Sequence, residues 1–153
     1  MLNASEPSKP FELLIVEDDP GDVYLLRMAL ASVRFPLHIT VLHDGEAAIQ
    51  YLIPESGTPA HALPDLMLLD LHLPKKSGEE VLAAIRSDPE ATRVPALVLS
   101  SSDAPKDRRR AFELGAHGYI QKQMNLDDLD LVVAGIEAFC QSFTAKSTKR
   151  TVH

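Results

Sequence analysis

The chain has 153 residues, 45% of them hydrophobic and 24% charged, which is the size and composition of one folded domain and not of a disordered protein. Its one cysteine, Cys140, excludes an intrachain disulfide and favours a reducing compartment. No run reaches the ~20 apolar residues that span a bilayer, and the N-terminus lacks a secretory signal pattern, so we expect a cytoplasmic protein without a membrane partner. A formal charge of −7 argues against nucleic acid as a partner.

Five short apolar runs alternate with helix-length amphipathic segments, which is typical of βα units around a parallel sheet. The runs at 13–16, 66–69 and 96–99 are unbroken and predict central strands covered on both faces. The run at 37–42 alternates and the one at 118–121 is short and mixed, so both predict edge strands. Right-handed crossovers then give the strand order 2-1-3-4-5.

Helix signals follow each of these strands. The first helix is expected to start after an N-cap at Asp19, with Pro20 in its first turn. Its spacing predicts that four apolar residues are buried: Val23, Leu26, Leu30 and Val33. Further helices are predicted after Asp44, after Gly78, over 104–114 and over 126–143, with a long Pro- and Gly-rich loop at 54–64.

The two ends of the chain differ in character from the middle. We expect a domain over residues 11–143, a flexible N-terminal tail over 1–10 and a basic C-terminal tail over 144–153. The last segment contains Lys146, Lys149 and Arg150 and no acidic residue.

Polar side chains gather where the strands end. The ends of strands 1, 3, 4 and 5 carry, in that order, Glu17, Asp18 and Asp19; Asp70; Ser100, Ser101 and Ser102; and Lys122. All of them emerge at the same edge of a parallel sheet, and the first two groups lie on neighbouring strands at the topological switch point. Their mutual repulsion calls for a cation.

The ligand chemistry at this edge favours Mg²⁺. The cluster offers carboxylate oxygens, whereas the histidines show no short metal-ligand spacing, which disfavours zinc. A carboxylate beside Mg²⁺ can attack a phosphoryl group and carry it as an acyl phosphate. Ser100 and Lys122 would then serve the phosphoryl oxygens as hydroxyl donor and point charge.

Four stretches of the sequence closely resemble the receiver domain of two-component response regulators. They are LLIVEDDPGDV, LMLLDLHLPKKSGEEVL, LVLSSSD and ELGAHGYIQK, and the similarity runs over residues 12–143. The resemblance implies a flavodoxin-like (βα)5 fold with three layers and a phosphoryl group accepted from a histidine kinase on Asp70.

The same resemblance implies roles for six further residues. Glu17 and Asp18 would hold Mg²⁺ together with Asp70, and His72 would lend its backbone carbonyl to the metal. Ser100 and Lys122 take the family's hydroxyl and lysine positions. Tyr119 falls where the family has a switching aromatic, so the helix 4, strand 5 and helix 5 face is expected to respond to phosphorylation.

Two residues depart from the family pattern. Glu17 replaces the first of two aspartates, which lengthens one arm of the metal site. Gln123 follows Lys122 where the family commonly has proline, so we expect either a trans bond with a reshaped loop or a strained cis bond. The chain also resembles a narrower group, the single-domain regulators that partner bacterial phytochrome histidine kinases. The features that carry this resemblance are the adjacent Lys75 and Lys76, the long loop at 54–64 before strand 3 and the expected absence of an output domain.

Two alternative functions remain open at this level. A phosphohydrolase of the haloacid-dehalogenase type also uses a strand-end aspartate with Mg²⁺, but its second acid is missing two residues after Asp70. A pseudo-receiver would use the fold only as a binding module.

The broad apolar surface of the last helix also suggests a homodimer through helix 4, strand 5 and helix 5.

Overall fold

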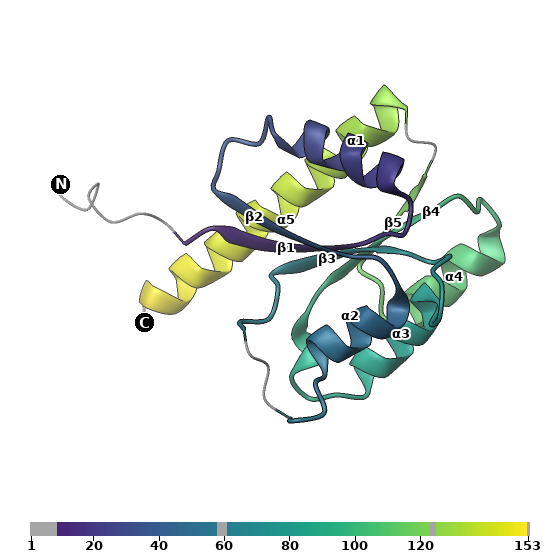
Figure 1. Cartoon of the computed structure of the whole chain (residues 1–153). Helices are drawn as coiled ribbons and strands as arrows, with labels where there is room; N and C mark the ends of the chain where they lie inside the picture. Colours follow the sequence, from purple (N-terminus) through teal and green to yellow (C-terminus); the bar gives the residue numbers. More distant parts are fainter. Residues whose placement is uncertain (1–8, 58–60, 123–124, 153) are drawn as a thin grey trace.

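The computed structural model describes residues 9–57, 61–122 and 125–152, and its centre is a five-stranded parallel sheet (Figure 1). The strands are β1 (Phe11–Val16), β2 (Leu37–Leu42), β3 (Leu66–Asp70), β4 (Ala96–Ser100) and β5 (Gly118–Gln121). Their order is β2-β1-β3-β4-β5, which confirms the predicted topology and the flavodoxin-like class.

Helices cover both faces of the sheet, giving three layers (Figure 1). One face carries α1 (Pro20–Leu30) and α5 (Leu126–Val152). The other carries α2 (Gly45–Leu52), α3 (Gly78–Arg86) and α4 (Pro105–Glu113), with the short helix η2 (Ala91–Arg93) after α3. Among the described residues, no helix is long and apolar enough to cross a membrane.

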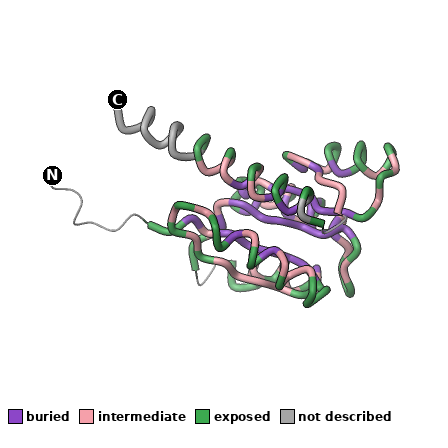
Figure 2. Tube along the Cα trace, turned by 90° about the horizontal axis from the view of Figure 1, so that it is seen from above, coloured by how far each residue is buried: buried purple, intermediate pink, exposed green. Residues whose placement is uncertain are grey.

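The sheet separates two hydrophobic cores, and the buried chain lies between the helix layers in Figure 2. Along β1, Leu14 and Val16 face the core under α2, α3 and α4, while Leu13 and Ile15 face the core under α1 and α5. Every residue of β3 and β4 is buried, whereas all six residues of β2 are half-buried or exposed. The predicted difference between central and edge strands is confirmed.

Side-chain caps fix the starts of the helices that lead away from the site. Asp19 caps α1 by accepting from the backbone N–H of Gly21 at 2.8 Å, and Asp44 caps α2 by accepting from that of Ala47 at 2.7 Å. Ser77 begins α3 with a capping box. These starts agree with the sequence because a cap depends on residues within one turn of each other.

The ends of two helices differ from the predictions. α1 stops at Leu30, so Val33 follows the helix and is half-buried, as is Val23; only Leu26 and Leu30 are buried as predicted. α5 continues beyond the expected end at residue 143 to Val152. Residues 144–152 contain neither glycine nor proline, and basic residues near a helix C-terminus favour the helix dipole, so no local signal ends the helix earlier. The bond between Lys122 and Gln123 lies outside the described residues.

Two glycines allow the loops beside the site to pack closely. A Cβ atom at Gly78 would lie 2.4 Å from the carbonyl oxygen of Asp70, and one at Gly45 would lie 1.9 Å from that of Lys76. Both neighbours are backbone atoms that cannot move without shifting the loop after β3. The glycines are therefore required for the position of the Asp70 segment.

Replacing Gly78 should destabilise the fold, whereas replacing Gly135 in α5 should not. We expect Gly78→Ala to lower the free energy of unfolding by about 1–3 kcal/mol through overpacking. Gly135→Ala should raise it by about 0.5–1 kcal/mol, because the new methyl group would make ordinary contact with Leu97 at 3.4 Å and alanine favours a helix. Urea unfolding followed by circular dichroism measures both, and equal shifts would contradict the packing argument.

Candidate functional site

Three predicted site residues meet at the carboxyl edge of β1 and β3. The register pairs Val16 of β1 with Leu69 of β3, so Glu17 and Asp70 leave adjacent strands side by side. Ligand oxygens of Glu17, Asp18 and Asp70 all lie within 4.8 Å of one another. The carboxylate cluster expected from the sequence is therefore formed.

Burial distinguishes these groups from ordinary surface acids. Glu17 is 3% exposed, Asp70 6% and Ser100 0%, and these are the buried polar residues of the described chain. Ser100 ends β4, the neighbour of β3, at the same edge. Burying carboxylates and a hydroxyl costs free energy unless they are paired, so their concentration at one point indicates a functional site.

Lys122 joins three acidic side chains. Its Nζ contacts Glu17 Oε1, lies 2.8 Å from Asp22 Oδ2 and lies 3.3 Å from Asp70 Oδ2. Glu17 and Asp70 were expected beside it, but Asp22 was not. Its only signal in the sequence is its place one turn after Asp18, in the first turn of α1.

The Glu17 carboxyl group and the Lys122 ammonium group shift each other's pKa. Burial and then hydrogen bonding to Asp70 raise the pKa of Glu17 to about 9, while its contact with Lys122 acts in the opposite direction. Burial by itself lowers the pKa of Lys122, but hydrogen bonds to Asp22 and Glu17 and the charge of Asp70 outweigh burial and raise it. Glu17 therefore takes up a proton more readily, and Lys122 loses one less readily, than the free side chains would.

The donor set fits a hard divalent cation. Glu17 Oε2 is buried without a hydrogen-bond partner among the described residues, as expected for an oxygen that a cation would engage. All the clustered ligands are carboxylate oxygens. The side chain of His72 is exposed, and its backbone N–H donates to Asp70 Oδ1 at 3.1 Å, which fixes the orientation of that carboxylate.

A chain of contacts leads from Ser100 to Tyr119. The backbone N–H of Ser102 donates to Ser100 Oγ at 3.1 Å, and the Tyr119 hydroxyl donates to the Ser102 carbonyl at 2.9 Å. Ser102 Oγ also donates to Asp107 in the first turn of α4, and the guanidinium of Arg108 lies 4.9 Å from the centre of the Tyr119 ring. The sequence placed Tyr119 in this region but gave no sign of Asp107 or Arg108, because their contacts depend on the loop after β4.

The loop after Asp70 is held under strain. Lys75 has a φ of 69°, a left-handed conformation that residues other than glycine seldom adopt. Its side chain pairs with Asp44 at 3.8 Å, and the backbone N–H of Gly45 donates to the Pro74 carbonyl at 3.3 Å. These contacts tie the loop to the start of α2, beside the acidic cluster.

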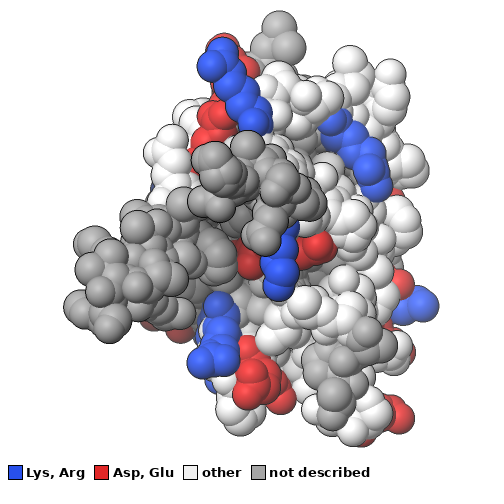
Figure 3. All heavy atoms as spheres, turned by 90° about the vertical axis from the view of Figure 1, so that its left-hand side faces the viewer, with Lys and Arg blue, Asp and Glu red and all other residues white. Residues whose placement is uncertain are grey.

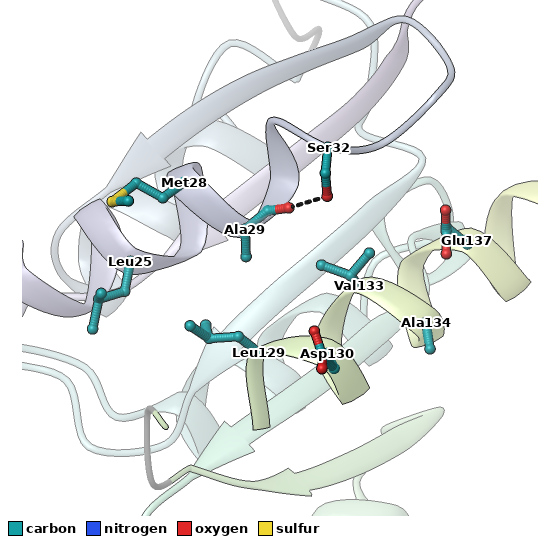
Figure 4. Close-up of a pocket in the computed structure, with 9 residues that line it drawn as sticks. All are labelled: Leu25, Met28, Ala29, Ser32, Leu129, Asp130, Val133, Ala134 and Glu137. Carbon is teal, nitrogen blue, oxygen red and sulfur yellow. Dashed lines mark hydrogen bonds between the residues drawn. The ribbon is translucent and has the colours of Figure 1, made fainter. Parts of the chain in front are cut away.

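Two other surfaces of the described chain lack a buried cluster of carboxylates, hydroxyl and lysine. A groove of about 480 Å³ lies between α1 and α5 (Figure 4). Its lining includes the apolar residues Leu25, Met28, Ala29, Leu129 and Val133 and the acidic residues Asp130 and Glu137. Figure 3 shows the molecule from the left of Figure 1, where the strands begin, and basic and acidic side chains are interspersed on that face. The carboxyl edge of the sheet is therefore the candidate site.

A parallel sheet of this order, with paired acids, a buried aspartate, a hydroxyl and a lysine at its carboxyl edge, defines the receiver class of signalling proteins. Residues 13–134 match the family model described as the response regulator receiver domain, and the chain belongs to that family.

Several proteins named response regulators are similar to this chain over most of its length. The response regulator Rcp1 of Synechocystis sp. is 38% identical over 89% of this chain and 92% of its own. The crystal structure of the phosphorylated cyanobacterial phytochrome response regulator RcpA is 41% identical, with a TM-score of 0.77 over 86% of this chain and 94% of that one. The Mn²⁺-bound form of Rcp1 is 38% identical, with a TM-score of 0.72 over 85% and 94% of the two chains.

Divalent cation binding should weaken as pH falls. A cation binds the deprotonated carboxylate, so below a pKa of about 9 its binding displaces a proton from Glu17. We expect the affinity measured by isothermal titration calorimetry to rise by up to about tenfold per pH unit between about pH 6 and 8. Glu17→Gln should weaken binding and flatten this dependence. An equally steep dependence in the variant would show that another group releases the proton.

Proposed function

We propose that this chain is a phosphoacceptor whose Asp70 receives a phosphoryl group from a histidine kinase. The observation that carries the proposal is the buried Asp70 carboxylate, held by the His72 backbone N–H on one oxygen and by Lys122 on the other. An isolated buried aspartate would be destabilising, and these contacts orient it while leaving it at the edge where a donor can approach.

The transfer is a substitution at phosphorus. An oxygen of Asp70 forms the new P–O bond while the P–N bond of a phosphohistidine breaks, and the imidazole leaves with its electron pair and takes up a proton. Lys122 would pair with one phosphoryl oxygen and Ser100 would donate its hydroxyl to another. These two groups would neutralise and orient the charge that Asp70 gains.

We assign the divalent site to Mg²⁺. Glu17, Asp18 and Asp70 would hold it with their carboxylates, and His72 would contribute its backbone carbonyl. When bound, the ion would shield the attacking carboxylate and the phosphoryl oxygens from each other. The oxygen-only donor set supports this choice, as does the Mn²⁺-bound form of the similar Rcp1.

The contacts of Ser102 suggest how the signal spreads. Ser100 Oγ accepts a hydrogen bond from the Ser102 backbone N–H, and a side-chain rotation that carries Oγ toward a phosphoryl oxygen would break that bond to the loop after β4. Because the same loop carries the acceptor for Tyr119, its movement would change how Tyr119 and α4 pack. The α4, β5 and α5 face is the proposed output surface.

The proposed partners follow from the relatives. Receiver domains take phosphoryl groups from sensor histidine kinases, and the similarity to the cyanobacterial phytochrome response regulator RcpA supports a phytochrome kinase as the donor. A downstream protein or phosphotransfer partner would read the modified state in the cytoplasm. Neither nucleic acid nor membrane is required for this role.

The alternatives lack comparable support. A phosphohydrolase needs a second acid near Asp70, and the position two residues on is the exposed His72. A pseudo-receiver would have no use for a buried acid pair with a lysine across it. Such pairs are costly, and a binding module gains nothing from them.

Asp70→Asn should abolish phosphorylation. We expect the unaltered protein to gain the mass of one phosphoryl group when treated with acetyl phosphate and Mg²⁺, and not after Mg²⁺ is removed with EDTA. Asp70→Asn should gain none, because an amide cannot form the acyl phosphate, while the exposed Asp103→Asn should behave like the unaltered protein. Intact-protein mass spectrometry gives the result. Modification of Asp70→Asn at the normal rate would reject Asp70 as acceptor.

A phosphorylation-dependent homodimer is the second prediction from this role. Sheet packing buries Leu129, Val132 and Ile136 of α5, but Leu131 stays 57% exposed and Phe112 of α4 44% exposed. Light scattering at tens of micromolar should show the mass doubling when a phosphoryl analogue such as beryllofluoride is added. Leu131→Lys should reduce this change by adding a charge to the contact. A monomer with and without the analogue would remove the dimer from the proposal.

A further inference from the structure

One acidic contact of Lys122 lies outside the proposed metal site. Asp22 Oδ2 is 2.8 Å from Lys122 Nζ, a shorter distance than the 3.3 Å to Asp70. Both side chains are mostly buried, at 18% and 13% exposure. The clustered carboxylates that can share a cation are those of Glu17, Asp18 and Asp70, and Asp22 is not among them.

The backbone on each side of this pair is fixed. Asp19 accepts hydrogen bonds from the backbone N–H groups of Gly21 and Asp22, at 2.8 and 3.3 Å, which sets the first turn of α1. The backbone N–H of Lys122 donates to the Ser100 carbonyl at 2.6 Å, which sets the end of β5. The Asp22–Lys122 pair therefore joins two rigid points that lie 100 residues apart in the chain.

A bound cation would change the partners of Lys122. Glu17 and Asp70 would become ligands and would share their charge with the ion, which also repels the ammonium group. Among the described residues, Asp22 would remain as the carboxylate that contacts Lys122 without binding the ion. An ammonium group left without it would be drawn toward solvent, away from the phosphoryl group that it has to meet.

We infer that Asp22 is a positioning residue that keeps Lys122 at Asp70 when the metal site is filled. The inference rests on the proposed function and deepens it, because it adds to the phosphoryl-transfer site a residue that acts only through Lys122. It also gives α1 a part in the reaction beyond packing on the sheet.

The helix dipole offers a simpler reason for an acid at this position. Asp22 lies in the first turn of α1, where a negative charge is favourable. Glu46 occupies the equivalent turn of α2 and is exposed, with its contact to Gln50 at 3.5 Å. Glu46→Gln therefore removes a dipole contribution of the same kind without touching Lys122, which makes it the matched control.

The contact itself can be tested without metal. In EDTA, urea unfolding of Asp22→Asn, Lys122→Met and the double variant should give non-additive midpoints. Asp22→Asn should lower the midpoint in the unaltered background, and should leave it unchanged or raise it when Lys122 is absent, because only repulsion between acids is then relieved. Additive shifts would overturn the inference.

The positioning role is tested at saturating Mg²⁺ with acetyl phosphate. Asp22→Asn should slow phosphoryl uptake by about tenfold, as for the loss of one charged hydrogen bond to the acting group. Asp22→Glu, which keeps the charge, should recover most of the rate, and Glu46→Gln should match the unaltered protein.

The two proposals fail in different ways. Normal uptake by Asp22→Asn, or an equal loss in Asp22→Glu and Asp22→Asn, would overturn the inference and leave the proposed function intact. No uptake by the unaltered protein would overturn the proposed function and the positioning role together.

Discussion

The central constraint in this molecule is the close approach of two buried carboxyl groups, Glu17 and Asp70, at the point where the strand order reverses. Parallel pairing of β1 with β3 places them there, and both side chains are buried, at 3% and 6% exposure. Lys122 supplies the compensating charge across a third strand end. The buried acidic charge is therefore compensated only once the sheet has placed the ends of β1, β3 and β5 at the same edge.

The close approach of these two carboxyl groups requires the loops around them, at the carboxyl edge of the sheet, to be held in place by close packing and hydrogen bonds. Glycines at 45 and 78 let the loop after β3 pack against the start of α2 with no space for a methyl group, and Lys75 is held in a left-handed conformation. On the other side, Ser102 joins Ser100, Tyr119 and Asp107. The segments on both sides of Asp70 are therefore closely packed. Because close-packed residues cannot easily absorb a displacement, a small movement caused by a change of charge at Asp70 is transmitted to the neighbouring loops.

The features that the sequence predicted well are those with local causes. The runs at 66–69 and 96–99 read as central strands because both faces are apolar. Asp19 reads as a cap, and a helix is expected after Asp44, because helix starts depend on residues within a single turn. The convergence of Glu17, Asp18 and Asp70 followed from parallel topology and needed no side-chain detail. The end of α5 was missed because no local residue ends it and composition alone suggested a tail.

Asp22 and Arg108 illustrate what sequence reasoning could not reach. Each contacts a residue far away in the chain: Asp22 contacts Lys122 just after β5, and Arg108 contacts Tyr119 in β5. Each sits on a helix face whose spacing looks like ordinary solvent exposure. The sequence did predict that Glu17 lengthens one arm of the metal site, but it did not show where that arm reaches. Its longer arm reaches Lys122 with one oxygen and leaves the other buried without a partner among the described residues. A cation that engages that oxygen would satisfy it and compete with Lys122 for the same carboxyl group, so metal binding and lysine placement are coupled through a single side chain.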